Sequence, residues 1–401
     1  MKDNKLWGGA FSKKPRQDVI DYCAGFDAQA FPALDALLLP YDIQSNRAHA
    51  EMLHAQGILS AAELDQIRTV LIDAEKTPPS LVGFEDVHTA VEAFVTARTP
   101  AGKKLHSGRS RNDLVAADTR LLMRDHAQKW QKNLETLVRT MEIIAKKHAE
   151  TAMPGFSHHQ PAVPYTYGKW LQAYASAFRR DAHTFDQWRE LYDECPLGAC
   201  AGFGTQFNIA PEKTAKKLGF SKPFSNSLDA VQQRWEAEAS LVFCIVKAMN
   251  HLSQMAESYM VLGMPGQALF RLPEEFCTGS SVMPHKKNPD FLEVTKAKAA
   301  VAHASLMQLN DAGKNAFTGY NRDSQWTKKA LLHALVECQA APALMSDFVA
   351  AVEPDVEKMK QACEPLTQTA KAERLAIEKG IPFRQAKEQV EKQIRKDAKT
   401  G

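Results

Sequence analysis

The chain has 401 residues, of which 44% are hydrophobic and 24% charged, an ordinary composition for a water-soluble globular protein. Fifty basic residues against 47 acidic ones leave a net charge of only +3, which argues against a nucleic-acid binder, since such a protein normally concentrates basic charge on one face. Seven scattered cysteines without a CxxC spacing indicate neither a zinc site nor a disulfide framework, and no signal peptide or membrane-spanning run is present, so we expect a reduced, cytoplasmic protein.

Residues 1–109 predict a mixed domain in which loops surround one or two helices. Ser60 and Glu63 stand at the spacing of a capping box, which predicts a helix that opens there and continues through Leu71. Strand-like alternation of apolar and polar residues is almost absent from the whole chain.

Long helices dominate residues 110–351. The first carries apolar residues at spacings of three and four (Leu134, Leu137, Met141, Ile144), and comparable helical windows cover 165–192, 229–262, 290–310 and 328–349. Helices of this length, joined by loops that contain Gly and Pro, are typical of an elongated bundle. Residues 352–401 are shorter, more charged and helical. We therefore predict an all-α protein with a long central bundle between an N-terminal and a shortened C-terminal domain.

The segment Gly279–Asp290 combines a flexible Gly-Ser-Ser start with a strong helix opening. Asn288 is expected to be the N-cap, Pro289 the first helical residue, and Asp290 an acid in the first turn. A capped helix after a loop does not explain why Ser-Ser, Met-Pro and Lys-Lys occur in the same few positions. The run resembles the fumarase/aspartase superfamily signature Gly-Ser-Ser-x-Met-Pro-x-Lys-x-Asn-Pro at every fixed position.

This resemblance implies an elimination in which a proton leaves the carbon next to a carboxylate and nitrogen leaves the neighbouring carbon. The difficult species is a doubly charged aci-carboxylate, which needs a base and fixed donors around the carboxylate. By resemblance, Ser280 is the base, and Lys286 and Asn288 bind the carboxylate whose charge grows. Loop N–H groups and Lys286 must stabilise the serine oxyanion. Lys287 is better explained as a surface lysine.

A second segment, Gly102–Asp113, is a loop that delivers donors to a helix N-terminus, which is a ready anion site. Asn112 or Asp113 could also cap that helix. Its Gly-Arg-Ser-Arg-Asn-Asp string resembles the argininosuccinate lyase branch of the superfamily. The resemblance places Ser110, Arg111 and Asn112 in the substrate site, where Arg111 suits a bidentate contact with a carboxylate.

A third segment, Met153–Gln160, contains two adjacent histidines. Neighbouring side chains point to opposite sides and no third ligand is apparent, so a metal site is not expected. The run resembles the family's Pro-Gly-Tyr-Thr-His-Leu-Gln, which makes His158 the site histidine and Ser157 the substrate-binding hydroxyl. In the family this histidine pairs with a glutamate, here Glu293, which orients the imidazole and raises its pKa for proton donation to the leaving nitrogen. Whether it donates directly or through water stays open.

Two more matches lie on either side of these segments. The run Tyr320–Lys328 resembles a family segment in which Tyr320, Gln325 and Lys328 correspond to substrate contacts. Glu85-Asp-Val-His88 resembles a segment whose histidine lies near the substrate, so His88 is included in the site. Each run alone would be an ordinary polar helix end, and their weight comes from occurring in the right order.

The resemblance spans residues 6–384 and implies three mainly helical domains, with the central helices of four subunits in one bundle. It also implies a homotetramer whose active sites collect segments from three subunits, a small-molecule substrate, no metal or organic cofactor, and no nucleic-acid or membrane partner. We place the domain boundaries at 1–109, 110–351 and 352–401.

Several positions depart from the family pattern and leave the substrate less certain than the chemistry. They are Ala10, Ala30 or Phe31, Ser45 with Asn46, Trp235 beside the matched Arg234, Trp326 with Thr327, and a short C-terminus. The leading hypothesis is conversion of argininosuccinate to arginine and fumarate in arginine biosynthesis. A close alternative is the same elimination on another N-substituted aspartate, adenylosuccinate being a weaker candidate. An alternative of another class is a catalytically silent, crystallin-like structural tetramer.

Overall fold

The computed structural model describes residue 13, residues 16–19 and residues 33–400, without the side chains of 398–400. Ala10, Ala30 and Phe31, where we noted departures from the family pattern, lie outside this part of the chain. Within it, no helix is both long and apolar enough to cross a bilayer.

The N-terminal part is a small helical unit. It comprises η1 (Leu34–Leu38), α2 (Leu39–Ala55), α3 (Ala61–Lys76), α4 (Val87–Arg98) and η2 (Pro100–His106). The predicted capping box is confirmed, because Ser60 Oγ accepts the Glu63 N–H at 3.3 Å and Ser60 N–H donates to Glu63 Oε2 at 2.9 Å. The helix runs to Lys76, five residues past the predicted Leu71.

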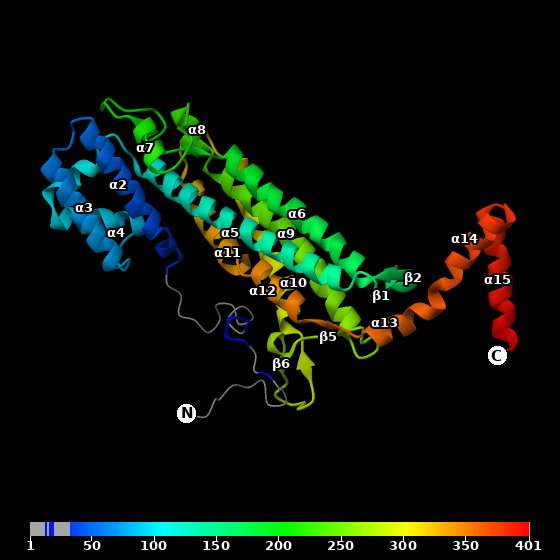
Figure 1. Cartoon of the computed structure of the whole chain (residues 1–401). Coiled ribbons are helices and arrows are strands. Elements are labelled where there is room, and N and C mark those ends of the chain that lie inside the picture. The colour runs from blue at the N-terminus through cyan, green and yellow to red at the C-terminus, as the bar shows by residue number, and fades with distance from the viewer. Residues whose placement is uncertain (1–12, 14–15, 20–32, 401) are drawn as a thin grey trace.

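The bundle is built from six helices in the middle of the chain: α5 (Arg111–Lys147), α6 (Tyr167–Leu191), α9 (Arg234–Gly263), α10 (Asp290–Lys314), α11 (Trp326–Cys338) and α12 (Ala341–Ala351). With 37 residues, α5 is about 55 Å long. It packs against α6 and α12, while α9 packs against α10, so the long helices lie side by side (Figure 1). Their apolar stripes meet in one core around Trp130, Phe178 and Tyr259, which confirms the predicted all-α fold.

One predicted helix is divided. The window 328–349 contains α11 and α12, which are separated at residues 339–340. Pro342 stands at the start of α12, and proline lacks the N–H that a continuous helix would use there. The helices of the bundle are otherwise close to the predicted windows.

Short elements connect the helices. They are α7 (Pro211–Lys217), α8 (Ser227–Gln232), η3 (Glu274–Phe276), η4 (Arg322–Gln325) and four two-stranded pairings: β1 (Ala152–Ser157) with β2 (Gln160–Thr166), β3 (Glu194–Cys195) with β4 (Lys222–Pro223), β5 (Phe270–Arg271) with β8 (Glu353–Pro354), and β6 (Thr278–Gly279) with β7 (Lys287–Asn288). The β3–β4 pair is parallel and the other three are antiparallel.

The β1–β2 hairpin carries the two adjacent histidines at its turn, although almost no strand-like alternation was found in the sequence. Ser157 faces Gln160 in the register, so His158 and His159 form the two-residue turn, with φ values of 52° and 59°. Such a turn needs positive φ at both positions and normally carries Asn or Gly. Helix α6 begins only at Tyr167.

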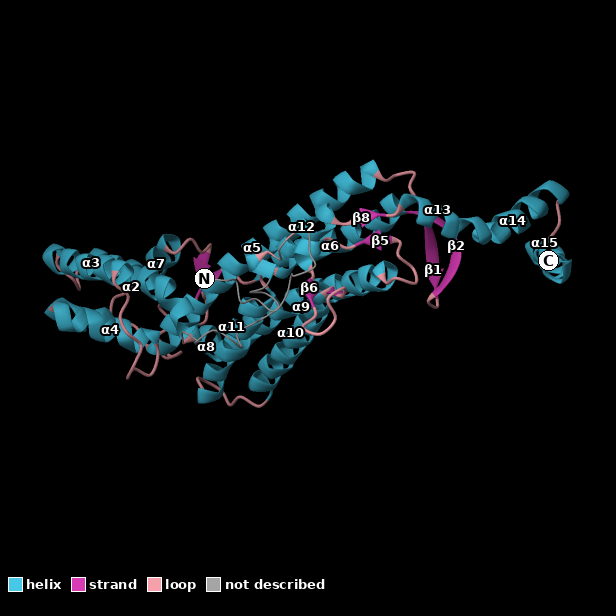
Figure 2. Cartoon of the chain, turned by 90° about the horizontal axis from the view of Figure 1, so that it is seen from below, coloured by secondary structure: helices cyan, strands magenta, loops and turns pink. Residues whose placement is uncertain are grey.

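The C-terminal part is helical, as predicted, and comprises α13 (Val356–Cys363), η5 (Glu364–Thr367), α14 (Gln368–Lys379) and α15 (Phe383–Thr400). Helices α14 and α15 form a hairpin that projects away from the bundle (Figures 1 and 2). Helix α5 begins at Arg111 and α12 ends at Ala351, next to the domain boundaries that we predict; the boundaries themselves stay a prediction.

Candidate active site

The predicted base, Ser280, begins a loop of residues 280–286, here called the serine loop. Strands β6 and β7 join its two ends, with Thr278 opposite Asn288 and Gly279 opposite Lys287. Within the loop, Ser280 Oγ accepts the Val282 N–H at 3.3 Å and the Met283 N–H at 3.0 Å. Two N–H groups directed at one hydroxyl oxygen favour negative charge on it. The loop geometry therefore suits a serine oxyanion.

The base of the serine loop is held by side chains and corrects one predicted cap. Asn288 Nδ2 donates to the Gly279 carbonyl at 3.2 Å, and Thr278 Oγ1 donates to the Asp290 carboxylate. Helix α10 begins at Asp290 with Pro289 as its N-cap residue and no side-chain cap. Asn288 is not the N-cap, because its backbone belongs to β7 and its amide is turned toward Gly279.

Lys286, at the end of the serine loop, and Lys287, at the start of β7, have different surroundings. Lys286 is exposed and lines a cavity of about 1400 Å³ behind the loop, together with Cys277 and His285. Lys287 forms an ion pair with Glu274, and its side chain is 43% exposed, as expected for a surface lysine. Both lysines line this cavity, but the Lys287 ammonium is paired with Glu274, so Lys286 is the better placed of the two to bind an anion.

His158 and Glu293 lie on different parts of the chain. His158 and Ser157 are exposed at the tip of the β1–β2 hairpin, which packs against α13 and η5. Glu293 is exposed in the first turn of α10, which packs against α9 and α11. Among the described residues, no hydrogen bond or ion pair joins His158 to Glu293. A single chain therefore does not form the predicted pair.

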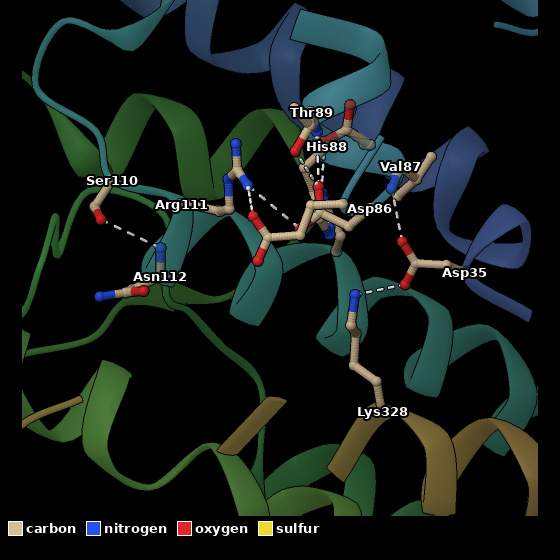
Figure 3. Close-up of polar contacts among 12 residues, drawn as sticks. Asp35, Asp86, Val87, His88, Thr89, Ser110, Arg111, Asn112 and Lys328 are labelled. Carbon is tan, nitrogen blue, oxygen red and sulfur yellow. Dashed lines mark hydrogen bonds and ion pairs between the residues drawn. The ribbon is translucent and has the colours of Figure 1, made fainter. Parts of the chain in front are cut away.

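The predicted anion-binding segment forms the start of α5 (Figure 3). Ser110 is the N-cap: its Oγ accepts the Asn112 N–H at 3.3 Å, and its own N–H donates to Asp113 Oδ1 at 2.9 Å. Asp113 thus belongs to the cap, as one of our two alternatives had it, whereas Asn112 does not close the helix. This arrangement leaves the half-buried side chains of Arg111 and Asn112 on the first turn, where the helix dipole favours anions.

Asp113 anchors this turn to the next loop. Its Oδ2 accepts the N–H groups of Gly198 at 2.9 Å and Cys200 at 2.8 Å. Burial raises the pKa of Asp113 to about 6, although these N–H groups and that of Ser110 lower it. The carboxylate is fully buried, so it holds the turn and is not available to a ligand.

Arg111 and Lys328 each contact carboxylates at the start of α4 or in η1 beside it (Figure 3). Arg111 Nη1 lies 3.5 Å from both Glu85 Oε2 and Asp86 Oδ2. Lys328 Nζ lies 2.5 Å from Asp35 Oδ1, and Asp35 Oδ2 accepts the Val87 N–H at 2.7 Å. The sequence did not predict Asp35 as a site residue, because it is a lone acid in an apolar stretch with no motif around it.

A cavity of about 550 Å³, here called the α11 pocket, lies between these groups. Its lining includes Asp35, Glu85, Asp86, Gln325, Trp326 and Lys328. Tyr320 is not in this lining, although it lies two residues before the lining residue Arg322. Its ring lies 5.7 Å from the buried Arg234 guanidinium. The structure thus brings Gln325 and Lys328 together with Glu85 and Asp86, the two acids that Arg111 contacts.

His88 is in the core, 2% exposed, between α2 and α5. Its Nδ1 lies 2.8 Å from Asp42 Oδ1 and 3.1 Å from Asp118 Oδ2. Burial by itself lowers the pKa of His88, but hydrogen bonds with Asp118 and Asp42 outweigh burial and raise it to about 9. An imidazolium shared by two carboxylates is therefore expected at neutral pH.

The same three side chains are the described group whose donor atoms lie close enough to hold a metal ion, within 4.8 Å of one another. Both carboxylates contact the same ring nitrogen of His88, which is the geometry of one shared proton. Burial raises the pKa of Asp118 to about 7, which further favours a proton in this cluster. A charged hydrogen-bonded cluster explains these residues better than a metal centre.

Comparison with known proteins extends these observations to the whole chain. Residues 58–303 match a family model described as lyase, a range that contains His88, the start of α5, the hairpin and the serine loop but not Tyr320–Lys328. The argininosuccinate lyase of Halorhodospira halophila is 38% identical over 98% of this chain and 84% of its own length. That of Desulfovibrio desulfuricans is 36% identical over 96% of this chain and 83% of its own length.

Solved structures show the same fold. An EDDS lyase in complex with formate superposes with a TM-score of 0.85, at 26% identity, over 98% of this chain and 78% of that one. A class II fumarase from Schistosoma mansoni has a TM-score of 0.75 at 16% identity, over 95% of this chain and 92% of that one, which is a likeness of fold alone.

Proposed function

The chain belongs to the argininosuccinate lyase family, and we propose that it cleaves argininosuccinate into fumarate and arginine by β-elimination. The observation that carries this proposal is the Ser280 hydroxyl, whose oxygen accepts two loop N–H groups in a chain 38% identical to an argininosuccinate lyase. This geometry supports a serine base, which the elimination needs.

In the proposed reaction, the Ser280 oxyanion removes a proton from the carbon beside a succinyl carboxylate. Negative charge then accumulates on that carboxylate, and the Lys286 ammonium and Asn288 amide stabilise it. The electron pair expels the guanidino nitrogen of arginine, which takes up a proton through His158, directly or by way of water. Each lost donor to the developing charge is expected to cost roughly 3–4 kcal/mol of barrier.

The start of α5 would hold the succinyl group. Helix N-termini favour anions, and the guanidinium of Arg111 can bind a carboxylate with two hydrogen bonds. At 3.5 Å, the contacts of Arg111 with Glu85 and Asp86 are long for hydrogen bonds, so little is lost when a substrate carboxylate replaces them. Ser110, Asn112 and Ser157 complete the proposed set of substrate contacts on this side.

We further propose a homotetramer with shared active sites, located in the cytoplasm. The hairpin with His158, the serine loop and the start of α5 project from separate parts of one chain, which supports completion of each site by neighbouring subunits (Figures 1 and 2). In this arrangement His158 of one subunit meets Glu293 of another.

Incubation of the purified protein with argininosuccinate tests the proposal, with fumarate followed by its ultraviolet absorbance and arginine by chromatography. We expect both products in equal amounts. Fumarate from another N-succinyl amine, with none from argininosuccinate, would support the alternative substrate. No turnover of any such compound by an intact oligomer would support the structural tetramer.

A further inference from the structure

Most charged side chains that line the α11 pocket already have partners within the chain. Its three carboxylates are already engaged: Asp35 by Lys328, Glu85 by Arg322 and Arg111, and Asp86 by Thr89 and Arg111. Lys328 and Arg322 are occupied by the same contacts. A ligand that enters the pocket therefore meets few anions or cations that lack a partner.

The groups that remain come from one stretch at the start of α11. Lys329 and Trp326 both line the pocket, and the positions i and i+3 of a helix lie on one face. The Lys329 side chain is exposed and takes part in no ion pair among the residues that the structure describes. Trp326 is 62% exposed, a large apolar surface beside a strongly charged cavity. Gln325, half-buried, adds an amide next to them.

These groups fit the chemistry of a particular ligand. A free ammonium recognises a carboxylate, and an exposed indole covers an aliphatic chain or the face of a planar cation. An amine that carries both an aliphatic chain and a carboxylate, as an α-amino acid does, would satisfy Lys329 and Trp326 together. A simple amine would leave the Lys329 ammonium without a partner.

We propose that Trp326 and Lys329 determine specificity for the leaving amine: Lys329 binds its carboxylate, and the Trp326 indole covers its chain. The inference rests on the proposed function and adds Trp326 and Lys329 to the substrate contacts that the resemblance implies, Tyr320, Gln325 and Lys328. Neither side chain takes part in the elimination itself, so both act on binding.

L-Arginine and agmatine, which is arginine without its carboxylate, separate the two roles. Binding of each compound to the assembled full-length protein is measured by calorimetry at fixed ionic strength. The wild type is expected to prefer L-arginine by about tenfold, in keeping with one charge-assisted contact. Lys329→Glu should remove this preference and Lys329→Arg should keep it. Trp326→Ala should weaken the binding of both compounds by a similar factor, about threefold to tenfold, and leave the preference for L-arginine unchanged.

Lys132→Glu, the same charge reversal at an exposed site on α5, is the matched control and should leave both affinities unchanged. Circular dichroism and sedimentation check that each variant folds and assembles. The inference is overturned if the wild type binds neither compound or both equally, or if Lys329→Glu keeps the preference.

Turnover of argininosuccinate by the wild type tests the proposed function independently of the roles of Trp326 and Lys329. No turnover together with a Lys329-dependent preference for L-arginine would refute the proposed function and retain this pocket assignment. Normal turnover with an unchanged preference in Lys329→Glu would refute the assignment alone.

Discussion

The start of α5 and the serine loop differ in how completely one chain builds them. At the start of α5, Ser110 and Asp113 form a capping box, and Arg111 is half-buried between two carboxylates. In the serine loop, residues 281–286 are all exposed, and the hydrogen bonds that fix the ends of the loop come mainly from the β6–β7 pair at its base. The comparison indicates that the proposed binding groups are prearranged within the chain, whereas the proposed catalytic groups depend on a loop and, in the proposed tetramer, on a second chain.

The largest effect that tests this contrast is expected at Ser280. Ser280→Ala removes the proposed base and should lower kcat by about a thousandfold or more, while substrate binding at the start of α5 persists. The measurement is fumarate release together with argininosuccinate affinity. Ser221→Ala, the same change at an exposed serine, should leave kcat unchanged. Near-normal turnover by the Ser280→Ala variant would show that Ser280 is not the base.

The next effect concerns the buried support behind the start of α5. His88→Leu leaves Asp42 and Asp118 without their shared cation and should lower the free energy of unfolding by about 3–5 kcal/mol. Chemical denaturation measures this change. His183→Leu, at an exposed histidine of α6, is the matched control and should change stability little. An equally small effect at His88 would contradict the charged cluster.

A smaller effect is expected where α9 meets α10. A Cβ added to Gly313 would lie 2.1 Å from the Trp235 ring, so Gly313→Ala should destabilise the protein by about 1–3 kcal/mol through overpacking. Replacing Trp235 by Ala in the same chain should relieve the clash. Gly266→Ala, where no atom lies within 4 Å of the added Cβ, should be near neutral in thermal unfolding. A similar loss at both glycines would argue against this contact.

The smallest effect, when taken over a single pH unit, is a pH dependence of stability from His88. Its folded pKa of about 9 lies above the ordinary histidine value of 6.5, so its contribution to stability is complete below pH 6.5 and is lost as the pH rises through 9. Loss of one bound proton limits the slope to about 1.4 kcal/mol per pH unit. Denaturation curves at several pH values measure the slope. His88→Leu should abolish the part of the pH dependence of stability that His88 contributes. A wild-type stability that rises over this range would contradict the assignment.

The bundle helices were predictable because their apolar stripes repeat with helical spacing, and α3 because Ser60 and Glu63 lie three residues apart. The hairpin was not, because His158 and His159 take positive φ without the Asn or Gly that marks such turns. The cap of α10 was assigned to Asn288 because local preference favours it, but pairing with β6 moved its amide to the Gly279 carbonyl.

Local sequence alone determined the helical class, the serine loop and the capped turn of Ser110 to Asp113, because each depends on groups a few residues apart. The tertiary structure decided which charges meet: Asp35 and Lys328, 293 residues apart, and the cluster of Asp42, His88 and Asp118. These contacts follow from how α2 packs beside α4 and α5, and from how η1 meets α11. No spacing along the chain encodes them, because each partner comes from a different helix or loop and is positioned by the packing of whole elements.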